Sequence, residues 1–413
     1  MKVLGIVSEY NPFHLGHVYH IEESIKRTGA THTICVMSGN FVQRGEPAIV
    51  DKWARTKMAL NGGIDLVLEL PVVFACASAE IFAYGAVRTL HSTGIVDYLS
   101  FGSEQGELGS LWRIASVLYD EPTEYKEHLK KYLGLGFSFP IARDKALTSI
   151  LRELPDNIMS KSNNILAIEY LKALKNLKSS IQPITLKRRG SVYTDNTLNS
   201  SYSSASAIRL FLKNGGQLTD PILNNNLPQY VIDIMEQELQ KRRGPVFPDA
   251  FEGIILQLLR MSSPEILQQI PDVNEGLENR LISCALNSGT LDELINLVTT
   301  SRYPTSRIKR ITSNLLWSIK KKDLQMFIND DTCGYLRVLG FNNKGRELLA
   351  RIQNESTRPL VVKVANYKKQ MSDLSKTMFE YDIKATNSYV LGFDEPKQRI
   401  GGQDFTMPIE MIW

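Results

Sequence analysis

The chain has 413 residues, of which 43% are hydrophobic and 22% charged, and its formal net charge is +4. This length predicts more than one domain, and the balanced composition excludes a disordered or fibrous protein. Because the net charge is small, a surface for nucleic acid would have to be a local basic patch.

No segment of the sequence predicts export or insertion into a membrane. The apolar run Leu66–Phe74 comes nearest to a spanning helix, but Glu69 and Pro71 interrupt it, and it is far shorter than the required ~20 residues. The N-terminus lacks a signal-peptide pattern. The four cysteines have no metal-ligand spacing, and we expect Cys35 and Cys76 to be buried free thiols. These features predict a soluble, cytoplasmic protein with no membrane partner.

The first hundred residues alternate short apolar strands with amphipathic helices. The expected strands are Val3–Ser8, Thr31–Ser38, Asp65–Leu70 and Asp97–Phe101, and the expected helices are Leu15–Arg27, Asp51–Asn61 and Ser78–His91. This alternation predicts an α/β fold with a doubly wound parallel sheet, in which ligands bind beyond the carboxyl ends of the strands.

The rest of the chain is predicted to be mainly helical. Residues 107–178 form an expected helical insertion, followed by a fifth strand at Pro183–Lys187 and a helix at Ala207–Lys213. We therefore expect a catalytic domain over residues 1–220. Residues 221–413 are expected to form a mainly α-helical C-terminal domain, with possible short strands at Leu360–Ala365 and Asn387–Leu391.

The segment Asn11–His17, which reads Asn-Pro-Phe-His-Leu-Gly-His, lies between the first strand and the first helix. A helix that begins near Gly16 leaves its first backbone N–H groups unpaired and directed at the turn. The imidazoles of His14 and His17 add two further polar groups there. The segment thus predicts a phosphate site, with a purely structural turn as the alternative.

A second helix start, Ser203–Arg209, is rich in hydroxyl groups and contains an arginine. Taken alone, it also fits a serine-capped surface helix. Together with the histidine turn it predicts a second phosphate cradle, in which serine hydroxyls, helix N–H groups and Arg209 hold the β- and γ-phosphates of a nucleotide.

The runs Gly5–His17 (GIVSEYNPFHLGH), Ser38–Pro47 (SGNFVQRGEP) and Ser203–Arg209 resemble the bacterial tRNA(Met) cytidine acetate ligase family, within the HIGH-type nucleotidyltransferases. The resemblance continues at Asn163–Leu171 and Ser301–Arg307 and covers essentially the whole chain. It implies an ATP-dependent ligase that activates acetate as acetyl-adenylate. The acetyl group would then pass to the N4 amine of the wobble cytidine of elongator tRNA(Met), with release of AMP and diphosphate.

The resemblance also implies roles for single residues. His14 and His17 would be catalytic and would stabilise the charge that develops at the α-phosphate. Alternatives from the residues themselves are a solvated basic face for Arg188, a plain turn for Gly102 and a helix cap for Asn163. The expected ATP-binding residues are Ile6, Val7, Ser8, Glu9, Tyr10, Asn11, Pro12, Phe13, His14, Leu15, Gly16, His17, His20, Gly102, Asn163, Arg188, Arg189, Ser203, Ser206 and Arg209.

Two further groups are candidates to face the other substrates. Asn40, Gln43 and Arg44 follow the second strand and could face acetate or cytidine. The stretch Ser301–Lys322 is basic and is interleaved with Tyr303 and Trp317, as in proteins that bind single-stranded RNA loops. Its alternative is an amphipathic helix with a solvated basic face and Trp317 in the core. The candidate tRNA-binding residues are Arg302, Arg307, Lys309, Arg310, Lys320, Lys321 and Lys322.

Two other functions fit the residues. One is an adenylyltransferase for a small phosphorylated metabolite, and the other is a non-catalytic RNA-binding protein on the same fold. The length beyond one nucleotidyltransferase domain favours a large partner, and two phosphate cradles favour an enzyme. No carboxylate cluster predicts a dedicated metal site, so Mg²⁺ is expected only together with ATP.

Overall fold

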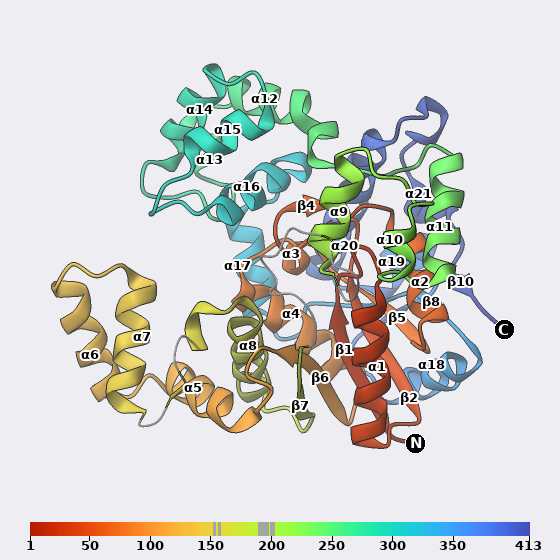
Figure 1. Cartoon of the computed structure of the whole chain (residues 1–413), viewed down its shortest axis with the longest axis horizontal. Helices are drawn as coiled ribbons and strands as arrows, with labels where there is room; N and C mark the ends of the chain where they lie inside the picture. The colour runs from red at the N-terminus through yellow and green to blue at the C-terminus, as the bar shows by residue number, and fades with distance from the viewer. Residues whose placement is uncertain (152–153, 156–157, 189–197, 199–202) are drawn as a thin grey trace.

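One mixed sheet of eight strands runs through the molecule, in the order β10-β8-β5-β2-β1-β6-β7 with β9 paired to β8 (Figure 1). It is seen in a computed structural model that describes residues 1–151, 154–155, 158–188, 198 and 203–413. The strands are β1 (Val3–Ser8), β2 (His32–Ser38), β5 (Leu66–Leu70), β6 (Tyr98–Ser103), β7 (Gln182–Lys187), β8 (Leu336–Phe341), β9 (Leu360–Val361) and β10 (Glu410–Met411).

The parallel part of the sheet has the order of a doubly wound fold. Strands β5, β2, β1, β6 and β7 pair in parallel, so the strand order reverses between β1 and β6. A crevice forms at such a reversal, beyond the carboxyl ends of the two strands. The predicted fold class is confirmed, and the histidine turn lies at this crevice.

Both faces of the sheet are covered, which explains why its strands are almost continuously apolar. In β2, Ile34 and Val36 pack into one core, while Cys35 and Met37 pack into the other. Cys35 and Cys76 are buried free thiols, as predicted. Around the sheet lie α1 (Leu15–Thr28), α2 (Lys52–Asn61), α3 (Val72–Ala75), α4 (Ala79–Ser92), α8 (Ser162–Asn176), α9 (Ala205–Lys213), α10 (Pro221–Asn224), α11 (Gln229–Gln240) and α18 (Asn343–Glu355).

Two helical lobes project from the sheet domain in Figure 1. The first is the predicted insertion, and it contains α5 (Leu108–Asp120), α6 (Thr123–Gly134) and α7 (Phe139–Ile150). The second contains α12 (Glu252–Met261), α13 (Pro264–Leu267), α14 (Leu277–Leu286), α15 (Leu291–Val298) and α16 (Thr305–Trp317). A hairpin of β3 (Phe41–Val42) and β4 (Glu46–Pro47) extends from the loop after β2 towards the second lobe, where β4 contacts α16.

The C-terminal part of the chain returns to the sheet. Strand β8 pairs antiparallel with β5, and β10 pairs in parallel with β8; neither strand was predicted. The division at residue 220 stays a prediction, although the sheet takes strands from both sides of it. The remaining helices are α17 (Lys321–Asn329), α19 (Tyr367–Gln370), α20 (Asp373–Tyr389) and α21 (Gln403–Thr406).

The two predicted C-terminal strands need correction. Only Leu360–Val361 of the segment Leu360–Ala365 is a strand. Asn387–Leu391 is not a strand, because it contains the end of α20 and the turn after it. Its short apolar pattern belongs to the buried face of a long helix: Met378, Phe379, Asp382, Ala385, Thr386 and Tyr389 are buried at helical spacing. Among the described residues, no helix is both long and apolar enough to span a bilayer.

Candidate active site

The histidine turn is held by two reciprocal hydrogen bonds. His14 is the N-cap of α1: its Nδ1 accepts from the Gly16 N–H at 3.0 Å, and His17 Nδ1 accepts from the His14 N–H at 3.1 Å. A ring nitrogen that accepts carries no proton, so each neutral imidazole has its proton on Nε2. The rings stack with their centroids 3.8 Å apart and line one cavity. The turn therefore offers two N–H donors, side by side, to a ligand in that cavity.

Gly16 makes this arrangement possible. A Cβ atom at residue 16 would lie 2.8 Å from Cε1 of His14. A larger residue would therefore push the His14 ring away from the end of the helix. Glycine is needed here for close approach of the ring, and its effect on backbone freedom is secondary.

Both catalytic candidates are neutral at physiological pH. Burial, together with the nearby charges of Arg188 and Arg209, lowers the pKa of His14 to about 3. Burial also places the pKa of His17 well below its usual value, helped by His14 and Arg188. The positive charge in the cavity thus comes from the arginines, while the histidines act as neutral donors.

The second cradle lies opposite, where α9 begins. Ser204 caps this helix by accepting from the Ala207 N–H at 3.1 Å. Arg209, one turn further on, donates from Nη1 to the Asn11 carbonyl at 2.6 Å, and its Nη2 lies 3.4 Å from Glu46 Oε2. A side chain from α9 is therefore fixed directly on the histidine turn, as expected for two cradles of one site.

Asn226 connects the two helix starts. Its backbone carbonyl accepts from the Leu15 N–H at 2.9 Å, and its side-chain Oδ1 accepts from the Ser203 N–H at 2.7 Å. The residue is buried and follows the short helix α10. Sequence reasoning missed it, because a single asparagine in a polar turn carries no signal of such a contact.

The third wall comes from β6, β7 and α8. Arg188 donates to Asn163 Oδ1 at 2.8 Å, and Asn163 Nδ2 donates to Glu104 Oε1 at 2.6 Å. Gly102 lies beneath the Arg188 side chain, because a Cβ atom there would be 3.2 Å from Arg188 Cγ. Asn163 is inside α8, whose N-cap is Lys161, so its side chain orients Arg188 and does not cap the helix. Glu104 was missed by the sequence analysis.

These walls enclose a cavity of about 230 Å³ at the reversal of strand order. Gln43 reaches it from the hairpin, where its backbone N–H donates to Glu9 Oε1 at 2.9 Å. The predicted residues that line the cavity are Ile6, Val7, Ser8, Glu9, Tyr10, Asn11, His14, Gly16, His17, His20, Gln43, Gly102, Asn163, Arg188, Ser203 and Arg209.

Other predicted residues lie elsewhere. Phe13 is fully buried in the core, and Pro12 and Leu15 form part of the turn without lining the cavity. The structure does not bring Asn40 to the cavity either: its buried amide oxygen accepts from the Lys52 N–H at 2.8 Å. Ser206 and Arg44 line a neighbouring cavity. Arg189 lies outside the described residues.

His20 lines the cavity, but its Nε2 lies 3.0 Å from Ser100 Oγ. Burial and Arg188 lower its pKa to about 4. Several apolar lining residues were missed, because they come from separate strand ends and helix faces and form no local motif: Phe82, Phe101, Leu166, Tyr170 and Leu186. Tyr19, Lys187, Ser204 and Ala205 also line it.

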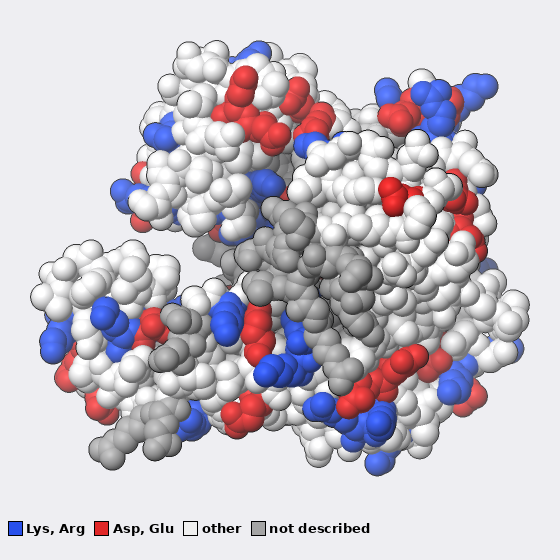
Figure 2. Space-filling model, in the orientation of Figure 1, with Lys and Arg blue, Asp and Glu red and all other residues white. Residues whose placement is uncertain are grey.

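The basic stretch Ser301–Lys322 is less exposed than its sequence suggests. Lys309 pairs with Glu46 at 2.7 Å, and Arg310 pairs with Asp272 at 3.1 Å. Arg307 donates to the Asp272 carbonyl, Arg302 pairs with Glu275 at 2.9 Å, and Lys321 donates to the Val273 carbonyl. Lys320 and Lys322 are exposed. On the face shown in Figure 2, basic and acidic side chains lie beside one another without forming one broad basic surface.

The aromatic part of the RNA prediction is wrong. Trp317 is 1% exposed and packs on Phe41 with ring centroids 4.7 Å apart, and Tyr303 is also buried. Neither ring has a free face for stacking on a base. Trp317 belongs to the buried face of α16, which was the alternative weighed above, whereas Tyr303 lies just before this helix.

Comparison with known proteins agrees with this geometry. The HIGH Nucleotidyl Transferase family matches residues 1–404. A tRNA(Met) cytidine acetate ligase of Acetivibrio thermocellus is 48% identical over 99% of both chains, and one of Clostridium perfringens is 40% identical over 99% of both chains. Thermotoga maritima TmcAL, bound with alpha-thio ATP, has a TM-score of 0.92 at 36% identity and covers 100% of this chain and 99% of its own. The apo form has a TM-score of 0.94 at the same identity and covers 100% of both chains. The chain therefore belongs to the tRNA(Met) cytidine acetate ligase family of HIGH nucleotidyltransferases.

Proposed function

We propose that the protein is an ATP-dependent ligase that forms acetyl-adenylate from acetate and transfers the acetyl group to the N4 amine of the wobble cytidine in elongator tRNA(Met). AMP and diphosphate are the other products. One observation carries the chemistry: the neutral Nε2–H groups of His14 and His17 face the same cavity as Arg188 and Arg209. The tRNA in this proposal is taken from the names of the curated relatives. ATP is taken from the alpha-thio ATP bound to the Thermotoga maritima neighbour. Such a reaction belongs in the cytoplasm.

In the first step, a carboxylate oxygen of acetate attacks the α-phosphorus and the bond to diphosphate breaks. Negative charge builds up on the α-phosphate oxygens in the transition state. His14 and His17 donate their Nε2–H groups to these oxygens, and the buried site strengthens each contact because water is excluded. Arg188, Arg209 and the N-terminus of α9 hold the rest of the triphosphate.

In the second step, the N4 amine attacks the acetyl carbonyl carbon, the bond to AMP breaks, and the proton that the amine loses is released to solvent. The first 220 residues supply the ATP site, and residues 221–413 contribute the surface for tRNA. Lys320 and Lys322 are exposed candidate cations, and Arg302 is also exposed but pairs with Glu275. Among the described residues no cluster of three His, Cys, Asp or Glu could hold a metal ion, so Mg²⁺ would be bound by the triphosphate of ATP.

The proposal is tested with the purified protein, labelled acetate, ATP and tRNA(Met). We expect ATP-dependent label in the tRNA, and acetate-dependent exchange of diphosphate into ATP without any tRNA. A matched tRNA with uridine at the wobble position should take up no label. Consumption of ATP with a phosphorylated metabolite, and no label in RNA, would replace the proposal by a small-molecule adenylyltransferase.

A further inference from the structure

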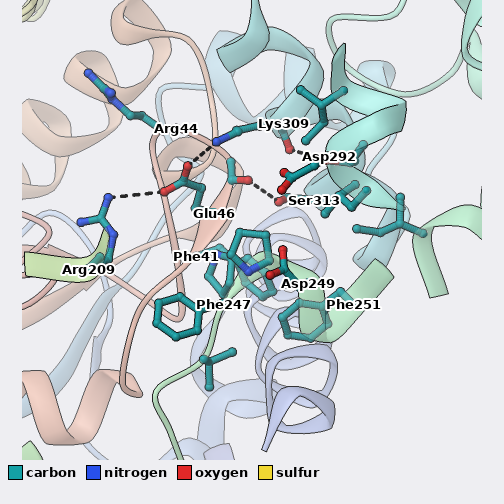
Figure 3. A pocket seen from close by; sticks show the side chains of 18 of the residues that line it. Phe41, Arg44, Glu46, Arg209, Phe247, Asp249, Phe251, Asp292, Lys309 and Ser313 are labelled. Atoms are coloured by element: carbon teal, nitrogen blue, oxygen red, sulfur yellow. Dashed lines mark hydrogen bonds and ion pairs between the residues drawn. The ribbon is translucent and has the colours of Figure 1, made fainter. Parts of the chain in front are cut away.

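A second cavity, of about 310 Å³, adjoins the nucleotide cavity on the β2 side. Figure 3 shows it between the β3–β4 hairpin, the start of α9 and the lobe that contains α15 and α16. Its volume is in the range of small-molecule sites, roughly 300–1,000 Å³. Its lining includes Ser206 and Arg209 from the expected ATP contacts, Arg44 from the candidates for acetate or cytidine, and Lys309 from the tRNA candidates.

The wall between the two cavities contains Arg209, which lines both. Its guanidinium donates to the Asn11 carbonyl on the nucleotide side and pairs with Glu46 on the other side at 3.4 Å. One guanidinium therefore spans the distance from the histidine turn to the Glu46 carboxylate. A group held at Glu46 would therefore be one guanidinium away from the histidine turn, where the α-phosphate is proposed to react.

The hairpin that carries Glu46 is fixed against α16. Gly45 has a φ of +72°, and a Cβ atom there would lie 2.3 Å from the backbone of Lys309 and Arg310, so only glycine allows this contact. Ser313 Oγ also donates to the Gly45 carbonyl at 2.9 Å. The cavity is thus built by contacts between the sheet domain and the helical lobe, and it is preformed.

The lining has an aromatic floor and a charged rim. Phe41 and Phe251 are almost fully buried, while Phe247 lines the cavity and is only half-buried. At the rim, Glu46 accepts from Lys309 at 2.7 Å and from Arg209. A carboxylate has about four acceptor positions, so Glu46 keeps capacity for a further donor.

Glu46 is an acceptor only. Its burial acts to raise its pKa, but the charges of Lys309 and Arg209 outweigh this effect and hold the pKa below its usual value. An ionised carboxylate accepts from the exocyclic amine of cytosine and repels the carbonyl oxygen that uracil has at the same place. The half-buried Phe247 ring offers the stacking surface that unpaired bases use in RNA recognition.

We propose that this second cavity receives the target cytosine, unstacked from the RNA, with its ring on Phe247 and its exocyclic amine at Glu46. This assignment rests on the proposed function, because it takes the acceptor to be a cytidine. The amine is then held beside Arg209, where the two cavities meet, on the side from which it attacks the acetyl carbonyl of the acyl-adenylate. Glu46 is a specificity-determining residue for the base, and Phe247 contributes affinity for it.

The Phe247→Ala variant distinguishes the function of this cavity from that of the nucleotide cavity. Base–aromatic stacking is worth enough to lower kcat/KM for acetyl transfer to tRNA roughly 5- to 150-fold. Acetate-dependent exchange of diphosphate into ATP should stay at the wild-type rate, because Phe247 does not line the nucleotide cavity. The control is Phe405→Ala on α21, an aromatic side chain 47% exposed that lines neither cavity; it should change neither rate.

Glu46→Gln tests base selection directly. An anticodon-arm RNA with cytidine at the target position should displace labelled tRNA(Met) from the wild-type protein better than its uridine counterpart. A glutamine amide can also donate to a uracil carbonyl. The ratio of the affinities for the cytidine and uridine RNAs should therefore be roughly tenfold smaller in the variant. This binding assay needs no catalysis, so it remains informative if the glutamine also disturbs Arg209.

The outcomes distinguish the two claims. A wild-type protein that acylates no tRNA refutes the proposed function. A protein that acylates tRNA but tolerates Phe247→Ala, or that shows equal loss of diphosphate exchange and acetyl transfer in this variant, refutes the cytosine cavity alone. An unchanged preference for cytidine in Glu46→Gln likewise refutes the role of Glu46.

Discussion

Replacing His14 by asparagine should remove one transition-state donor while keeping the start of α1. Asparagine is among the best N-cap residues, so its side-chain oxygen can accept the N–H that His14 Nδ1 accepts now. Its side chain is too short to place a donor where His14 has Nε2. The variant therefore isolates the chemistry of the ring from its structural role.

The size of the effect follows from the position of the ring. His14 is 7% exposed and lies in a cavity that binding of nucleotide would close to water, so water cannot replace the lost donor. Loss of one such donor typically lowers kcat by about 10²–10³, or ~2.7–4 kcal/mol. A lost helix cap would cost about 0.5–2 kcal/mol of stability, which asparagine avoids.

The assay is acetate-dependent exchange of labelled diphosphate into ATP, without tRNA. We expect kcat and kcat/KM for ATP to fall by similar factors, since the contact matters most in the transition state. His91→Asn, the same change at an exposed histidine of α4, is the control and should leave both unchanged. A full exchange rate in His14→Asn, or a loss confined to KM, would show that the histidine turn does not stabilise the reacting phosphate.

The structure makes three further predictions. Because the pKa of His14 is low in the folded protein, acidification protonates this histidine in the unfolded chain first. The free energy of unfolding should therefore fall as the pH falls from about 6.5 towards 3, by up to about 1.4 kcal/mol per pH unit. Denaturant titrations at pH 7 to 4.5 should show a shallower loss in His14→Asn, and an equal loss would contradict this assignment. Asn226→Ala should weaken ATP binding about tenfold in calorimetry by freeing both helix starts, whereas Asn225→Ala, at an exposed neighbour, should not. Charge reversal at Lys320 and Lys322 should weaken tRNA binding and reduce its dependence on salt by about one unit of slope per residue, with diphosphate exchange intact. An unchanged slope would remove these lysines from the tRNA surface.

Local signals in the sequence determined the first strand, the first helix and the chemistry of the turn between them. Apolar runs and helix caps act over a few residues, so β1 and α1 could be predicted from the chain alone, as could a serine-rich helix start before Lys213, although α9 begins at Ala205 and not at the predicted Ala207. The pairing of the histidine turn with Ser203–Arg209 was also predictable, because both are helix starts suited to phosphate. Acetate and tRNA entered only through resemblance to a family.

Tertiary structure decided what lies between these elements. Asn226 and Glu104 act through contacts with residues distant in sequence, and neither has a local pattern that marks it. The sequence of Ser301–Lys322 predicts one basic surface. In the fold, several of its cations instead form ion pairs with Asp272, Glu275 and Glu46, because packing brings these carboxylates from other segments next to them. The second cavity exists only where the hairpin meets α16. A sequence states which groups are present, whereas packing decides which of them face a ligand and which face each other.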